Sequence, residues 1–185
     1  MDVTLHTQRL VLRQPHRNDA PRIARALNNF AVAGKLSTVP YPYSESDAHW
    51  WLDRQRADKP AGDTAFMIEL CGEGVIGNCS LHLRDGEPIL GYWLAEAFWN
   101  RGFMSEAAAA VIAWYFDVTG AAQVGSGAFA FNKASLAVQR KLGFTEIGSS
   151  TLHCLARGED LRHIDTRLTR QRWTELHGAA AKEAT

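Results

Sequence analysis

Two short stretches of the sequence combine residue types that could do chemistry. The first, Asn100-Arg101-Gly102, falls between a predicted strand and a predicted helix. A helix N-terminus presents unpaired backbone N–H groups and the positive end of the helix dipole. Glycine lets a ligand approach the backbone closely, and arginine adds positive charge. These features are typical of a phosphate cradle, although an ordinary strand-to-helix turn would use the same residues. The loop is neither a Walker loop nor a G-x-G-x-x-G fingerprint.

The second stretch begins at Asn132, where another predicted strand passes into a helix that Gly143 is suited to end. Asn132 is a good helix N-cap, which is a structural role that needs no ligand. Ser135 follows by about one helical turn, so the amide and the hydroxyl can face the same side. The pair could therefore present polar groups to a shared site.

A third set of residues could act as a general base. The candidates are Glu69, His82, Glu87 and Glu106. A neutral histidine suits proton transfer near neutral pH, but a hydrogen-bonded histidine on a strand is the simpler interpretation of His82. A carboxylate at Glu106, in a first helical turn, stabilises the helix N-terminus without any catalytic role. The sequence alone assigns no base, and a water relay would serve equally well.

The elements that must position these residues follow from periodicity and turn signals. Alternating apolar residues predict about seven strands, and capping patterns with three-to-four-residue periodicity predict about four helices. Asp85-Gly86 predicts a hairpin between the third and fourth strands. The predicted strands are 9–13, 66–70, 75–83, 89–95, 123–130, 144–155 and 161–170, and the predicted helices are 19–28, 44–55, 101–118 and 132–142.

This order predicts an α+β (mixed α/β) fold with a mixed, mostly antiparallel sheet covered by helices. The short connections make the strands between residues 66 and 95 antiparallel, whereas the later strand-helix-strand step should be parallel and right-handed. Within the strand 75–83, strict alternation places Val75 with Cys79 and Leu81 on one face. The same alternation places Ile76 with His82 on the other face.

Taken together and in order, these segments resemble the GNAT acetyltransferase superfamily, and within it the branch of ribosomal-protein N-terminal acetyltransferases. The resemblance covers about residues 7 to 173. It rests on TQRLVLRQP at the start, VIGNCSLH and GYWL in the middle strands, WNRGFMSEA, NKASLAVQRKLGF, and HIDTRLTRQRW near the end. The ordered set is specific, whereas no single segment is decisive.

The resemblance implies acetyl-coenzyme A (acetyl-CoA) as the acetyl donor and no metal. It assigns backbone contacts with the pantetheine arm to two residues of a strand, the pyrophosphate to a loop, and a further pantetheine contact to an asparagine. These residues are Trp93, Leu94, Asn100, Arg101, Gly102, Phe103, Met104, Ser105 and Asn132. Two positions depart from the family pattern, which has glycine at Asn100 and Gln or Arg at Ala97. Asparagine tolerates the left-handed conformation, so we expect the loop to survive.

A third departure concerns the proton donor. Many family members carry a tyrosine seven residues after the asparagine, and this sequence has Gln139 there. Glutamine cannot protonate a leaving thiolate. The motif makes Ser135 the nearest hydroxyl, so Ser135 is the predicted acid; cofactor contact or helix-start packing is the alternative role.

By the same resemblance, the acceptor pocket is expected to involve Tyr41, Tyr43 and Trp50, together with His82. The expected reaction is direct attack of a primary amine on the thioester in a ternary complex. The amine belongs either to a protein N-terminus or to a small molecule. A non-catalytic acyl-CoA-binding module or sensor is the alternative function.

Composition restricts the remaining classes. The 185 residues carry zero formal net charge, which argues against a general nucleic-acid binder. Three cysteines match no zinc pattern, and no signal peptide or membrane span is evident. We therefore expect a cytoplasmic protein, monomeric or homodimeric, with one domain over residues 1–175 and a frayed tail over 176–185.

Overall fold

The computed structural model describes residues 3–56 and 63–178, which form one eight-stranded sheet in the order β1-β2-β3-β4-β5-β6-β8-β7. The strands are β1 (Leu5–His6), β2 (Leu10–Arg13), β3 (Thr64–Leu70), β4 (Gly74–Arg84), β5 (Glu87–Leu94), β6 (Gln123–Phe129), β7 (Thr145–Cys154) and β8 (Glu159–Thr169). The α-helices are α1 (Ala20–Leu27), α2 (Phe30–Ala33), α3 (Glu45–Arg56), α4 (Phe103–Thr119), α5 (Lys133–Leu142) and α6 (Arg170–His177).

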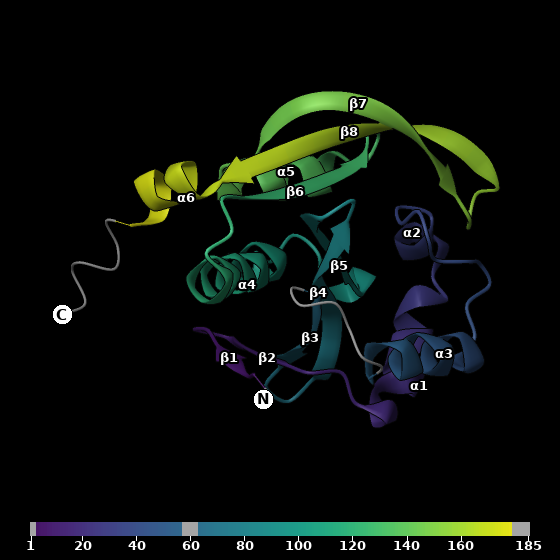
Figure 1. Ribbon diagram of the computed structural model, residues 1–185. Coiled ribbons are helices and arrows are strands. Elements are labelled where there is room, and N and C mark those ends of the chain that lie inside the picture. The colour runs from purple at the N-terminus through teal and green to yellow at the C-terminus, as the bar shows by residue number, and fades with distance from the viewer. Residues whose placement is uncertain (1–2, 57–62, 179–185) are drawn as a thin grey trace.

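Helices cover both faces of the sheet, as Figure 1 shows: α4 lies on one face and α1 and α3 lie on the other. The larger core lies beneath α4, where Ala107, Val111 and Ile112 are fully buried against β2 to β5. Small side chains such as Ala107 let this helix approach the sheet closely. The second core lies beneath α1 and α3 and includes Ile23, Leu52 and Met67. The mixed α+β class that the sequence predicts is confirmed.

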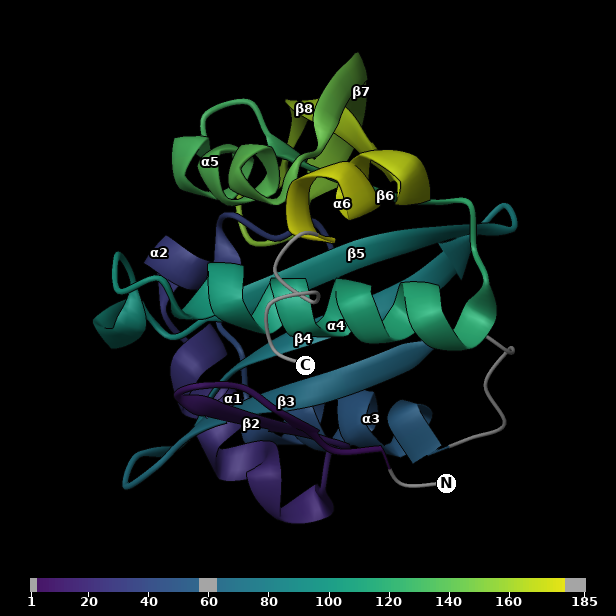
Figure 2. The same ribbon diagram turned by 90° about the vertical axis from the view of Figure 1, so that its left-hand side faces the viewer.

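The sheet divides between β5 and β6. These strands are parallel, as predicted for the strand-helix-strand step through α4, but in the described chain their ladder contains only the pair Ile89↔Gly125. Beyond this pair the strands separate, and Figure 2 shows β6, β7 and β8 leaning away from β5 above α4. The remaining part of the sheet is antiparallel, including β6 with β8 and β8 with β7. The separation leaves backbone groups of β5 without a neighbouring strand.

A β-bulge in β4 corrects one prediction about side-chain direction. The pairing of β3 with β4 shifts between Ile68 and Glu69, so that Ile76 is an extra residue on β4. An extra residue reverses the alternation on one side of the bulge. Ile76 therefore packs in the core beneath α4, and Val75 packs beneath α1 and α3. The prediction that Val75 shares a face with Cys79 and Leu81 is wrong.

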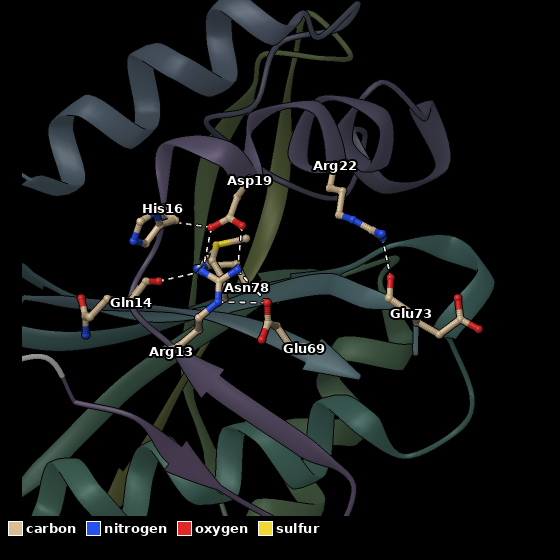
Figure 3. A network of polar contacts seen from close by, with 9 residues as sticks. Arg13, Gln14, His16, Asp19, Arg22, Glu69, Glu73 and Asn78 are labelled. Atoms are coloured by element: carbon tan, nitrogen blue, oxygen red, sulfur yellow. Dashed lines mark hydrogen bonds and ion pairs between the residues drawn. The ribbon is translucent and has the colours of Figure 1, made fainter. Parts of the chain in front are cut away.

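An ion-pair network fixes the start of the first helix layer against the sheet (Figure 3). The Arg13 guanidinium donates from Nη1 and Nη2 to the two carboxylate oxygens of buried Asp19, at 2.9 and 2.7 Å, and from Nε and Nη2 to Glu69 Oε1. These contacts raise the pKa of Arg13 above its ordinary value, despite the opposing effect of burial. Asp19 also accepts the backbone N–H of His16 at 2.7 Å. A buried carboxylate is thereby fully paired.

The structure contains more short elements than the sequence predicts. The two-residue β1 and the four-residue α2 are too short to produce a periodic pattern. The α6 helix begins at Arg170 and extends to His177, so it includes the first two residues of the predicted tail. No helix of the described residues is long and apolar enough to cross a bilayer. Across residues 3–56 and 63–178, no cluster of three His, Cys, Asp or Glu side chains could hold a metal ion.

Candidate active site

A cavity of about 860 Å³ occupies the gap between β5 and β6. The start of α4 borders one part of it and the start of α5 borders another. Strand β8 and the segment after α2 enclose the side opposite α4. Most of the predicted cofactor residues line this cavity, namely Trp93, Leu94, Asn100, Gly102, Phe103, Met104, Ser105 and Asn132, as do the predicted catalytic residues His82 and Ser135. The gap in the sheet therefore brings together segments that are far apart in the sequence.

The loop before α4 has the backbone shape expected of an anion cradle. Asn100 and Gly102 both adopt the left-handed conformation, with φ of 59° and 79°. The expectation that asparagine can replace glycine at position 100 is confirmed for its conformation. No side chain caps the start of α4, so the first backbone N–H groups of the helix remain available. Arg9 stabilises the loop, because its Nη1 donates to the Arg101 carbonyl at 3.0 Å.

Arg101 does not belong to the residues that line the cavity. Its guanidinium lies over the rings of Phe98 and Phe103, with its Cζ atom 5.8 and 4.8 Å from the ring centroids. These contacts hold the side chain along the outside of the loop. In this geometry, Arg101 contributes to loop shape and to the local positive charge.

The backbone of β5 alternates between β4 and the gap. Ala95 donates its N–H to Ile76 on the β4 side, so alternation turns the backbone of Trp93 toward β4 as well and that of Tyr92 and Leu94 toward the gap. The carbonyl of Leu94 accepts the Trp99 indole N–H at 2.8 Å. The backbone contact with the pantetheine arm that was predicted for Trp93 is therefore expected at Tyr92 instead. The Trp93 side chain still lines the cavity.

The start of α5 presents side chains rather than backbone. Asn132 caps the helix by accepting the backbone N–H of Ser135 through Oδ1 at 3.4 Å, which leaves its amide N–H₂ group free to donate. The Ser135 hydroxyl lies 2.9 Å from the Tyr92 hydroxyl, and the two can donate to each other in either direction. Burial raises the pKa of Tyr92 to about 12. Tyr92 therefore stays protonated at neutral pH.

Gln139 joins these two hydroxyls. It is 1% exposed, and its Nε2 donates to the Gly127 carbonyl at 3.0 Å and lies 3.4 and 3.3 Å from the Tyr92 and Ser135 hydroxyls. Its Oε1 accepts the Thr166 hydroxyl at 2.7 Å. The sequence identifies Gln139 only as a missing acid. The structure shows that it holds a polar cluster which includes Tyr92, a residue that sequence reasoning missed.

The face of the cavity opposite α4 carries two histidines. His82 of β4 is largely buried; burial lowers its pKa, Arg84 adds to the decrease, and Asp63 opposes it. His163 of β8 was not predicted. Its Nδ1 lies 2.8 Å from Asp165 Oδ1, and its ring occupies the space beside Gly127, where a Cβ atom would lie 2.2 Å from His163 Cε1. The His163 ring can therefore occupy this position only because residue 127 is glycine.

The geometry argues against two of the predicted bases. The Glu106 carboxylate accepts the Thr7 hydroxyl at 2.6 Å and the Arg9 Nε at 2.7 Å, and it lies outside the cavity lining. Glu69 is paired with Arg13, also away from the cavity. Glu87 does line the cavity, where it accepts from the Gln123 amide at 2.9 Å. Glu106 therefore anchors the N-terminal strands to α4.

The predicted aromatic residues do not line this cavity. Tyr43 is buried in the second core, and burial raises the pKa of its hydroxyl to about 12. Trp50 is 64% exposed beneath the Arg54 guanidinium, and the ring of Tyr41 packs edge-on against Phe30. Instead, the lining near the two histidines comes from Val32, Lys35, Leu36 and Ser37, and from Ile147 and Leu152 of β7. Sequence reasoning missed the first group because α2 carries no periodic signal. It missed Ile147 and Leu152 because a predicted strand does not reveal which distant segments it faces.

Comparison with known proteins identifies the family of the chain. Residues 9–145 match the model of a family described as an acetyltransferase (GNAT) domain. The chain also resembles the structure of a ribosomal-protein-S5-alanine acetyltransferase from Vibrio fischeri, with a TM-score of 0.77 and 22% identity over 93% of this chain and 99% of that one. A second similar structure is Mycobacterium smegmatis RimJ in complex with CoA-disulfide, with a TM-score of 0.77 and 19% identity over 97% and 94% of the two chains.

A third similar structure is the microcin C7 self-immunity acetyltransferase MccE in complex with acetyl-CoA and AMP. Its TM-score is 0.77 and its identity 18%, over 88% of this chain and 93% of that one. At these identities the structural matches establish a shared fold, and the family model, which covers most of the chain, establishes membership. The chain is a member of the GNAT acetyltransferase family.

Proposed function

We propose that this protein transfers an acetyl group from acetyl-CoA to a primary amine. The observation that carries the proposal is the open gap beside β5, with an uncapped helix start at one part of it and a hydroxyl cluster at another. The residues fit this cosubstrate. A strand edge without a neighbouring strand can pair with a pantetheine arm, and the left-handed loop at Asn100 and Gly102 lets a pyrophosphate approach the N–H groups of α4.

The protein's own residues then have separate tasks. Acetyl-CoA supplies an activated acetyl group as a thioester. The start of α4 holds the pyrophosphate, Asn132 donates to the pantetheine arm, and the backbone N–H of Leu94 is positioned to stabilise negative charge on the carbonyl oxygen. On the opposite face, His82 is neutral at pH 7 because burial lowers its pKa, so it can accept a proton from the incoming amine.

Two classes of acceptor are consistent with the relatives. The Vibrio fischeri protein is named for the alanine of a ribosomal protein, whereas MccE is named for microcin C7 self-immunity and its structure contains acetyl-CoA and AMP. An α-amine has a pKa near 8 and a lysine side chain one near 10.4, so an α-amine loses its proton more easily. We therefore propose a protein N-terminal α-amine as the first class to test.

The proposed location is the cytoplasm, and the proposed enzyme domain is residues 1–175. The three cysteines Cys71, Cys79 and Cys154 are unpaired thiols, which favours a reducing compartment. Cys79 is fully buried in the core beneath α4, and burial raises the pKa of its thiol, so it is not a reactive nucleophile.

The proposal is tested in two steps. Acetyl-CoA at about 100 times its dissociation constant should stabilise the fold by about 2.7 kcal/mol, measured by a thermal-shift scan and calorimetry. Thiol release should then accelerate with one member of a panel of N-terminal peptides, polyamines and amino acids. Binding without turnover across the panel would favour an acyl-CoA-binding module. Absence of binding at millimolar acetyl-CoA would overturn both functions.

A further inference from the structure

The hydroxyls of Tyr92 and Ser135 and the Gln139 amide form a cluster beside the cavity, and Gln139 acts as the hydrogen-bond donor toward both hydroxyls. Gln139 Nε2 carries two protons and has three acceptors within 3.4 Å: the Gly127 carbonyl and the hydroxyls of Tyr92 and Ser135. The amide orientation is fixed, because the Gly127 carbonyl can only accept and the Thr166 hydroxyl donates to Oε1. One amide proton therefore goes to Gly127, and the other is shared between the two hydroxyls. Both hydroxyl oxygens act as acceptors toward Gln139.

This arrangement can leave one hydroxyl proton for the cavity. Tyr92 and Ser135 have one O–H each, and only one of these protons can lie on the 2.9 Å line between their oxygens. The Tyr92 hydroxyl also lies 3.2 Å from the Ser135 backbone carbonyl, so it can donate to either oxygen of Ser135. When Tyr92 donates to the Ser135 hydroxyl, which is the nearer of the two, the Ser135 proton is the one left over. Both residues line the cavity, whereas Gln139 is buried behind them. A carboxylate at position 139 would accept both protons instead, and no donor would face the cavity.

We infer that Tyr92, Ser135 and Gln139 form a proton relay that protonates the departing sulfur, with Gln139 as the positioning residue that sets its direction. The inference rests on the proposed function. As the amine nitrogen forms its bond to the acetyl carbon, the C–S bond breaks and its electron pair stays on sulfur. Sulfur takes the Ser135 proton, and Ser135 takes the Tyr92 proton. Solvent then reprotonates Tyr92 as products leave, and the proton lost by the amine passes to solvent.

The strand tyrosine supplies an acidity that serine lacks. Burial raises the pKa of Tyr92 to about 12, yet the phenol is still a much stronger acid than an alkyl hydroxyl, so a serine relaying a phenol proton is a better donor than a serine alone. Gln139 has no acidic proton, and Tyr92, which lies 47 positions earlier in the chain, supplies one in its place. Because α5 and β5 hold the two hydroxyls in contact, no movement is needed to connect them.

The first experiment compares two tyrosines of the core, one partly buried at the cavity and one fully buried away from it. Tyr92→Phe removes the relay proton but keeps the ring, and Tyr115→Phe makes the same change in a buried tyrosine that does not line the cavity. With acetyl-CoA and the fastest amine of the panel, kcat of Tyr92→Phe should fall on the order of 10²-fold, the lower end for a positioned acid. The dissociation constant of acetyl-CoA should change less than about threefold, and Tyr115→Phe should match the wild type.

The second experiment tests whether the hydroxyls act as one unit. Ser135→Ala should lower kcat by a factor similar to that of Tyr92→Phe, with little change in KM for acetyl-CoA. The double variant should lose no more than the worse single variant, because either change alone interrupts the relay. Ser80→Ala is the matched control, since Ser80 donates to the Gly91 carbonyl within the sheet and does not line the cavity. Multiplicative losses in the double variant would overturn the relay.

The third experiment reverses the direction. Gln139→Glu and Gln139→Met both lose the bond to the Gly127 carbonyl, but only glutamate can accept from both hydroxyls when ionised. Relative to wild type at each pH, kcat of Gln139→Glu should rise as pH falls and its carboxylate is protonated, whereas the ratio for Gln139→Met should stay flat. Equal, pH-independent ratios for the two variants would overturn the directional role of Gln139.

The outcomes separate the two levels of the argument. If wild-type protein neither binds acetyl-CoA nor releases thiol, the proposed function fails. If wild-type protein turns over and Tyr92→Phe equals Tyr115→Phe, the function stands and the relay is overturned.

Discussion

Helices α4 and α5 both begin at the same cavity, but they present different chemistry to it. α4 starts at Gly102 in the left-handed conformation with no side-chain cap, so its first turn offers backbone N–H groups. α5 starts at Asn132, whose side chain accepts the N–H of Ser135, so its first turn offers an amide and a hydroxyl. The difference follows from the two N-cap residues: glycine has no side chain with which to satisfy the helix, and asparagine does.

The comparison teaches how one fold divides binding from chemistry. A backbone cradle tolerates almost any side chain that keeps its shape, because the N–H groups belong to every residue. A side-chain cluster depends on particular atoms, such as the Tyr92 hydroxyl and the Gln139 amide. We therefore expect substitutions at α4 to act through conformation and substitutions at α5 to act through single functional groups.

The largest expected effect comes from Gly102→Val. A branched side chain at φ of 79° strains the loop and blocks close approach of a pyrophosphate. Losing two hydrogen bonds to a charged group should weaken acetyl-CoA binding on the order of 10²- to 10⁴-fold in calorimetry. Gly72→Val is the matched control, with φ of 80° in an open turn outside the cavity lining. Equal affinities in the two variants would remove α4 from the binding site.

A smaller effect is expected at His82, where the imidazole side chain is the proposed base. His82→Gln should lower kcat about 10²-fold, with His153→Gln, an exposed histidine paired with Asp160, as control. Burial lowers the pKa of His82, so the protonated, inactive form should accumulate only below the ordinary histidine range. The acid limb of the kcat profile should therefore lie below about pH 6.5 and be absent in the variant. An unchanged profile would exclude His82 as the base.

Asn132→Asp should separate the two uses of one side chain. Aspartate keeps the oxygen that accepts the N–H of Ser135, and its charge favours a helix N-terminus. It lacks the amide donor, so acetyl-CoA affinity should fall about 2- to 10-fold while the midpoint of thermal unfolding is unchanged or rises. A drop in thermal stability with intact affinity would instead show that Asn132 serves only the helix.

The smallest effect is expected where α4 is fastened to the N-terminal strands. Burial raises the pKa of Glu106, but hydrogen bonds from Thr7 and Arg9 outweigh it, and the net pKa lies below its ordinary value. Glu106 therefore stabilises the fold above the unfolded-state pKa, and this contribution is lost as pH falls through the folded-state pKa. Glu106→Gln should cost about 1 kcal/mol at pH 7 in urea unfolding, and much less near pH 3. A pH-independent loss would contradict this assignment.

Local patterns predicted the conformation of the loop before α4 and the helix cap at Asn132 well. The left-handed loop, the cap at Asn132 and the hydroxyl of Ser135 all depend on residues within a few positions of one another. The elements and the α+β class followed from periodicity in the same way. The two-residue β1 and four-residue α2 escaped because so few residues cannot establish a period.

What the sequence could not supply is the pairing of distant residues. Glu106 was a candidate base because its partner Arg9 lies 97 positions away, and Tyr92 was not singled out because its partner Ser135 lies 43 positions away. The aromatics Tyr41, Tyr43 and Trp50 were assigned to the acceptor pocket by resemblance, yet the fold places Tyr43 in the second core and the other two at the surface. The bulge at Ile76 likewise reversed the direction of a side chain that strict alternation assigns to the wrong face.

The ladder between β5 and β6 contains a single residue pair, and this affects how fast the backbone amides of β5 exchange with solvent. Amides of Tyr92 and Leu94 face the gap rather than a neighbouring strand, so they lie within a sheet yet lack the partner that slows exchange with deuterated solvent. Amides of Gly91 and Trp93, which alternate toward β4, should exchange far more slowly. A molecule bound along β5 would accept hydrogen bonds from the gap-facing amides and slow their exchange to the rate of their neighbours. Exchange rates at alternate residues of β5 would therefore show whether the cavity is occupied before any product forms.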